Sequence, residues 1–151
     1  LDMVYHALSI VFPDVRAKKY IEVRMPDNVP FPYNFAIVAL VKNIFYNKDL
    51  LEYLYSDVFA GMTYDDHINL KDKAQEYGIG TPYKDKKIWE WMLDIISRIK
   101  EDRKYLDPLE ELVKKQMTPR DIYEKLYKED PQKALYEFSV NKFIRDIDDQ
   151  N

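Results

Sequence analysis

A carboxylate and a guanidinium near the start of the chain have the types and spacing of a polar binding site. Glu22 and Arg24 lie two residues apart within residues 18–27. Because side chains alternate across a strand, this spacing places both on one face, roughly 7 Å apart. The carboxylate could hold a cation and the guanidinium an anion such as phosphate. Periodicity alone leaves open that the pair is only a solvated ladder of charges on a surface strand.

The elements that must position this pair follow from the same periodicity. Ile21, Val23 and Met25 form an apolar strand face that suits a core. We expect an α+β fold that is mostly α: one N-terminal strand followed by about six helices. The expected helical segments are 33–46 (buried on most sides), 48–60, 63–77 and 86–104, with short helices opening at Asp107-Pro108, Thr118-Pro119 and Asp130-Pro131. A lone strand is unstable, so this one requires a partner sheet.

Acidic residues of the 86–104 segment fall opposite its stripe of isoleucine and tryptophan. That placement predicts a solvent-facing helix surface and no site. The residues concerned are Glu90, Asp94, Glu101 and Asp102.

Composition excludes several classes of function. The chain has 151 residues, enough for one domain, a net charge of −4 and no cysteine. It therefore has no basic footprint for nucleic acid, no disulfide framework and no thiolate zinc site. Three glycines argue against a glycine-rich phosphate loop, and the longest apolar run, 35–41, is too short to span a membrane. We expect a cytoplasmic protein, and the start at Leu1-Asp2-Met3 suggests a piece of a longer polypeptide.

Four blocks of sequence resemble a known family. In chain order they are His6–Arg16, then Lys19–Arg24 with Asp27, then Phe35–Leu40 with Phe45-Tyr46, and finally Tyr105–Val113 with Met117-Thr118-Pro119. Together they resemble the late signature of glutamate–cysteine ligases, closest to the plant-type and related bacterial branch. The blocks extend over most of the chain.

This resemblance implies the C-terminal part of an ATP-dependent ligase with a glutamine-synthetase-like sheet. Residues 1–151 would belong to the catalytic domain, with the catalytic strand and loop in 1–32 and a helical cap in 33–151. Such an enzyme phosphorylates the γ-carboxylate of glutamate, and the amine of cysteine then displaces phosphate. The product, γ-glutamylcysteine, belongs to glutathione biosynthesis. The implied partners are glutamate, cysteine, ATP and Mg²⁺, with no nucleic acid and no membrane.

The resemblance also carries roles over to individual residues. Glu22 matches a glutamate that helps to bind magnesium, and Arg24 matches an arginine that contacts ATP phosphate or the phosphorylated intermediate. Arg16 lies in a matching motif and could hold glutamate or the phosphates. His6 and Asp27 also match the motif, but no chemistry is assigned to them.

The chain departs from this family in two respects. The larger part of the enzyme, which supplies most of the sheet and of the metal ligands, has no counterpart in this sequence. We therefore expect no ligase activity from these residues alone, and a sheet supplied by a missing N-terminal part or by another copy. Met25-Pro26 also replaces the Gly-Ala that often follows the arginine. Two alternatives remain: another carboxylate–amine ligase on the same scaffold, and a non-catalytic helical interaction module.

Overall fold

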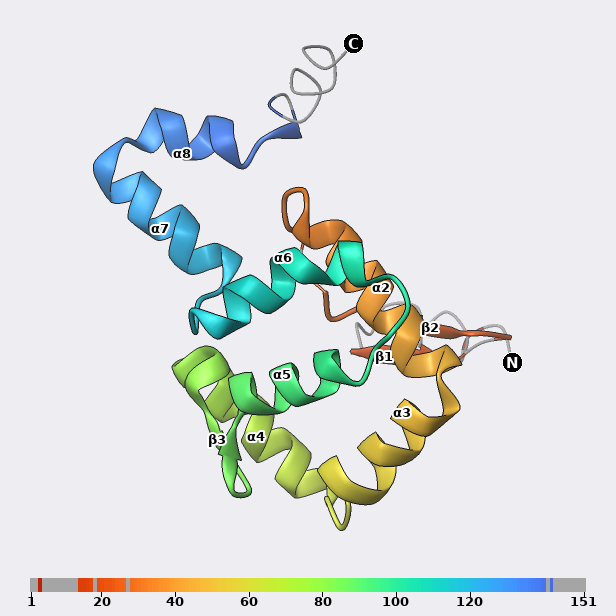
Figure 1. The fold of residues 1–151 in the computed structure, drawn as a ribbon. Coiled ribbons are helices and arrows are strands. Elements are labelled where there is room, and N and C mark those ends of the chain that lie inside the picture. Colours follow the sequence, from red (N-terminus) through yellow and green to blue (C-terminus); the bar gives the residue numbers. More distant parts are fainter. Residues whose placement is uncertain (1–2, 4–13, 18, 27, 141, 143–151) are drawn as a thin grey trace.

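Helices make up most of the chain in the computed structural model (Figure 1). The structure describes residues 3, 14–17, 19–26, 28–140 and 142. Their helical elements are α2 (Tyr33–Tyr46), α3 (Lys48–Tyr53), the π-helix η1 (Leu54–Val58), α4 (Tyr64–Tyr77), the 3-10 turn η2 (Gly78–Gly80), α5 (Ile88–Ser97), α6 (Arg103–Lys114), α7 (Pro119–Glu129) and α8 (Pro131–Glu137). The expectation of a mostly helical chain is confirmed.

The core lies where α2, the α3–η1 segment, α5 and α6 meet. Its buried side chains are Ala39, Leu50, Leu54, Val58, Ile96, Ile99 and Leu106. Trp91 and Ile95 of α5 pack against this cluster from its edge. The apolar stripe read from the 86–104 segment therefore does face the core, as its helical spacing predicts.

The boundary between α5 and α6 differs from the prediction. The helix predicted over 86–104 stops at Ser97, and α6 begins at Arg103 instead of at Asp107-Pro108. Asp102 lies directly before α6: its φ of 58° is left-handed, and its carboxylate accepts hydrogen bonds from Lys42 and Asn43 of α2. Pro108 consequently lies inside α6, where it cannot donate to the carbonyl of Lys104.

Other helix ends follow their sequence signals. Thr118 accepts from the N–H of Asp121 at the start of α7, and Asp130 caps α8 in the same manner. α4 begins after Thr63 and stops at Gly78, whose φ is positive. α7 and α8 pack mainly against each other and project from the remaining helices (Figure 1).

The expectation that the 33–46 helix is buried on most sides is wrong. Only the small or polar side chains Ala36, Ala39 and Asn43 are buried, on the side that packs against α6. Four large apolar side chains of α2 are exposed: Phe35, Val38, Phe45 and Tyr46. The helix carries apolar residues on nearly all sides, but neighbouring elements cover only one of them.

The expectation of a single N-terminal strand is also wrong. β1 (Val15–Ala17) pairs with β2 (Ile21–Val23) as an antiparallel hairpin, and a second pair joins β3 (Pro82–Tyr83) to β4 (Lys86–Lys87). β2 is much shorter than the predicted 18–27 and finds its partner within this chain. A glutamine-synthetase-like sheet stays a prediction. None of the described helices combines the length and the apolar character needed to cross a membrane.

Candidate functional site

The β1–β2 hairpin brings the predicted site residues together. Its register places Arg16 directly opposite Glu22. Arg16 Nη2 donates to Glu22 Oε2 at 2.7 Å and to Oε1 at 3.1 Å, and Arg16 Nε donates to Oε2 at 3.0 Å. Arg24 Nε lies 3.8 Å from Glu22 Oε1. One carboxylate is therefore held between two guanidinium groups, and the cluster carries a net charge of +1.

The backbone and a tertiary ion pair fix this geometry. The N–H of Arg24 donates to the carbonyl of Asp14 at 2.9 Å, which extends the hairpin beyond its last paired residues. The Asp14 carboxylate accepts from Lys71 of α4 at 2.5 Å. The hairpin is thus attached to the helical body at its base.

The charged face of the hairpin is partly buried. The Arg16, Glu22 and Arg24 side chains are only 21–30% exposed. On the opposite face Val15 is 50% exposed, Ile21 58% and Met25 54%, while Val23 is partly buried. The expectation that the face of Ile21, Val23 and Met25 enters a core of the chain is wrong for Ile21 and Met25. The partly buried charged face is therefore the one that could bind a ligand.

This donor set suits an anion better than a metal ion. A guanidinium fork matches the paired oxygens of a phosphate or carboxylate. Magnesium requires several oxygen ligands in octahedral arrangement, whereas the hairpin offers one carboxylate that two arginines already hold. No group of three potential metal ligands occurs among the residues that the structure describes. These residues do not fit a magnesium site by themselves.

The sequence predicted the shared face of Glu22 and Arg24 but missed the direct pairing of Glu22 with Arg16. A signal for it was available. The triplets at 15–17 and 21–23 both have a charge between two apolar residues, and the two charges are opposite, as in a cross-strand pair. His6 and Asp27 lie outside the described residues.

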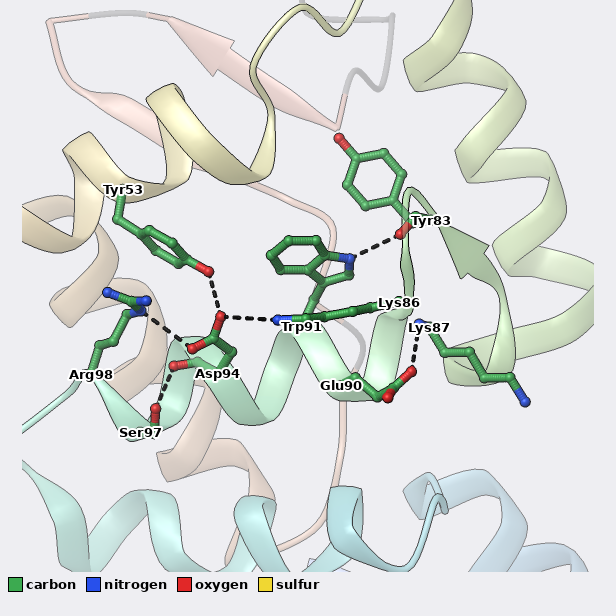
Figure 2. Close-up of polar contacts among 9 residues, drawn as sticks. All are labelled: Tyr53, Tyr83, Lys86, Lys87, Glu90, Trp91, Asp94, Ser97 and Arg98. Carbon is green, nitrogen blue, oxygen red and sulfur yellow. Dashed lines mark hydrogen bonds and ion pairs between the residues drawn. The ribbon is translucent and has the colours of Figure 1, made fainter.

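A second polar cluster surrounds Asp94, where the sequence predicted only a solvent-facing helix surface (Figure 2). Asp94 is half-buried, and its carboxylate accepts the hydroxyl of Tyr53 and forms ion pairs with Arg98 at 3.4 Å and Lys86 at 3.6 Å. Arg98 also lies over the Tyr53 ring at 3.6 Å. The prediction is wrong for Asp94, as it is for Asp102. Only the Asp94–Arg98 spacing of four residues was visible in the sequence.

The charges of this cluster indicate a structural role. The Tyr53 hydrogen bond, supported by Arg98 and Lys86 against the cost of burial, lowers the pKa of Asp94. Burial and the Asp94 carboxylate raise the pKa of Tyr53. At neutral pH the tyrosine therefore donates to a charged carboxylate, and neither group is poised to exchange a proton. The cluster joins α3, β4 and α5.

Comparison with known proteins finds several enzymes of the same kind that are similar to this chain. No protein-family model matches the sequence. The chain is 27% identical over 128 residues to the chloroplastic glutamate–cysteine ligase of Solanum lycopersicum, covering 80% of this chain and 24% of that enzyme. The chain is 26% identical to the Arabidopsis thaliana enzyme over 128 residues, which again cover 80% of this chain and 24% of that enzyme. Glutamate–cysteine ligase B of Oryza sativa subsp. japonica is 31% identical over 78 residues, 52% of this chain and 16% of that enzyme. The chain is therefore similar to plant glutamate–cysteine ligases and spans about a quarter of the length of the curated relatives it matches.

Proposed function

We propose that this chain is the C-terminal part of an ATP-dependent glutamate–cysteine ligase. In the proposed reaction the γ-carboxylate of glutamate attacks the γ-phosphorus of ATP and releases ADP. The amine of cysteine then attacks the resulting acyl phosphate, and phosphate leaves as the amide bond forms. The observation that carries the proposal is the convergence of Arg16, Glu22 and Arg24 on one hairpin face, in a chain similar to plant glutamate–cysteine ligases.

The geometry supports different roles for the two arginines. Arg16 commits its Nε and Nη2 atoms to Glu22, so it acts mainly by holding that carboxylate in place. Arg24, whose Nε lies 3.8 Å from Glu22 Oε1, is the residue that the resemblance to the ligases points to as the contact of a phosphate oxygen of ATP or of the acyl phosphate. Fixed positive charge at a transferring phosphoryl group stabilises the charge that spreads over its oxygens.

Magnesium binding by Glu22 stays a prediction that the residues described by the structure do not satisfy alone. A magnesium site would need further oxygen ligands from outside the described residues. The proposal therefore assigns those ligands, and most of the catalytic sheet, to the remaining part of the enzyme or to another copy. In this arrangement residues 1–32 carry the catalytic edge and residues 33–151 form a helical cap. The cytoplasmic location stays a prediction as well.

Exchanging the charges of Arg16 and Glu22 tests whether these residues form a ligase site or only a solvated ladder of charges on a surface strand. In the complete enzyme, the double variant Arg16→Glu with Glu22→Arg keeps an opposite-charge pair across the strands. It moves the carboxylate from β2 to β1 and so displaces it from the side of Arg24. We expect a normal circular dichroism spectrum and a fall in kcat of about 10²-fold or more, measured as glutamate- and cysteine-dependent ADP release.

The matched control is the Arg120→Glu with Glu124→Arg swap on α7, where the pair is exposed and lies at 2.6 Å. It should leave kcat unchanged. Full activity in the hairpin swap would refute the site. Failure of the complete, unmutated enzyme to bind Mg-ATP and glutamate in titration calorimetry would refute the proposed function and favour a non-catalytic module. Turnover with an amine other than cysteine would identify a related carboxylate–amine ligase.

A further inference from the structure

α2 carries four exposed apolar side chains, here called the α2 stripe: Phe35, Val38, Phe45 and Tyr46. Their spacing places them along one side of the helix over about 16 Å. Val38, in the middle, is 67% exposed. Phe35 stacks on Tyr105 of α6 with ring centroids 6.1 Å apart, so the stripe continues onto a second helix.

The one charged residue of α2, a helix that the structure describes in full, does not make the stripe polar. The Lys42 ammonium group lies 2.8 Å from the Asp102 carboxylate, at the turn before α6. Its charge is therefore compensated within this chain. The polar group that α2 does bury, the Asn43 amide, donates to the Ala39 carbonyl and to Asp102. The α2 stripe thus offers a partner an apolar surface without an unpaired charge.

The size of the stripe argues against a second copy of the chain as its occupant. Three aromatic rings and one valine, each about half exposed or more, present on the order of 400 Å². A stable interface between separate proteins buries about 800 Å² on each partner. A patch of this size is better matched to a segment of the same polypeptide. The covalent link gives that segment a high effective concentration at the patch, so a smaller contact area suffices.

The lengths of the relatives supply such a segment. The chain matches 24% of the tomato enzyme, which leaves about three quarters of that enzyme outside the match. We propose that the α2 stripe is the surface on which an apolar face of the remaining, larger part of the same polypeptide packs. The inference rests on the proposed function for the identity of this occupant, and on the exposure of α2 for the location of the interface.

Cysteine labelling tests the interface without reference to activity. The 151 residues contain no cysteine. The Val38→Cys variant of the complete polypeptide is labelled with a maleimide, and the modified peptide is followed by mass spectrometry. The control is Gln75→Cys, an exposed polar position in the last two turns of α4. Each rate is divided by the rate of the same variant in denaturant.

We expect the thiol of the Val38→Cys variant to react about tenfold or more slowly than that of the control, because packing must open before the thiol is reached. Equal rates would overturn the proposal, as would a coding frame that contains nothing beyond these 151 residues. Protection that disappears on dilution would also overturn it, since the occupant would then be a second copy. Protection in a polypeptide that fails to bind Mg-ATP would refute the proposed ligase while leaving the interface intact.

Discussion

The hydrogen bond from Tyr53 to Asp94 provides a sharp test of how the helices are held together. Tyr53→Phe removes the hydroxyl and leaves the Arg98 and Lys86 ion pairs of Asp94 in place (Figure 2). Hydrogen bonds to charged groups contribute about 1.5–3 kcal/mol when shielded from water. The Asp94 side chain is 26% exposed, so partial screening reduces this value. We expect a loss of about 1 kcal/mol in the free energy of unfolding, measured by urea denaturation at pH 7.

The pH dependence of this loss follows from the two pKa shifts. The pKa of Asp94 is lowered in the folded state from its ordinary value of 3.8, so the stabilisation is complete above that value. It disappears as the pH falls through the lowered folded pKa. The pKa of Tyr53 is raised from 10.0, so its contribution is complete below pH 10.0 and disappears as the pH rises through the folded value. The difference between wild type and Tyr53→Phe should therefore be constant near neutrality and shrink at both extremes.

A neighbouring tyrosine supplies the matched control. Tyr55 of η1 is 78% exposed, and Tyr55→Phe should change the free energy of unfolding by less than about 0.5 kcal/mol. Equal losses for the two variants would show that the Tyr53 hydroxyl contributes nothing specific. A loss for Tyr53→Phe that persists unchanged in acid would show that the charged Asp94 is not its partner.

Three further substitutions test the core, a cap and a turn by the same measurement. Leu106→Ala should cost about 2–5 kcal/mol because its side chain is fully buried, whereas Leu135→Ala, half exposed on α8, should cost far less. Thr118→Ala should cost about 1 kcal/mol, since its hydroxyl accepts from the N–H of Asp121, and equal stability would exclude this cap. Gly78→Ala should cost about 1–3 kcal/mol because the backbone there has φ 58° and ψ −142°, while Gly80→Ala, outside the left-handed region and in open space, should be nearly neutral.

Local signals predicted the helices but not the contacts between residues far apart in the chain. The threonine, aspartate and proline signals before α7 and α8 act within one turn, so they could be found in the sequence. The turn at Asp102, directly before α6, contacts Lys42 and Asn43, about 60 residues away along the chain. The half-burial of Asp94 likewise depends on Tyr53, which lies on another helix. Periodicity reports which side of a helix is apolar, but it does not report which neighbours cover that side.

The hairpin shows the same limit at the candidate site. Alternation correctly separated the charged face from the apolar face, but the assumption that the apolar face enters a core was wrong for Ile21 and Met25. A two-stranded hairpin is marginal without a packed face, and in this one Arg16, Glu22 and Arg24 are partly buried while Ile21 and Met25 are exposed. Apolar side chains of both the hairpin and α2 are thus exposed. The larger polypeptide proposed for the ligase would have to cover the α2 stripe and complete the sheet, so a complete enzyme in which position 38 and the hairpin are both fully exposed would contradict both proposals together.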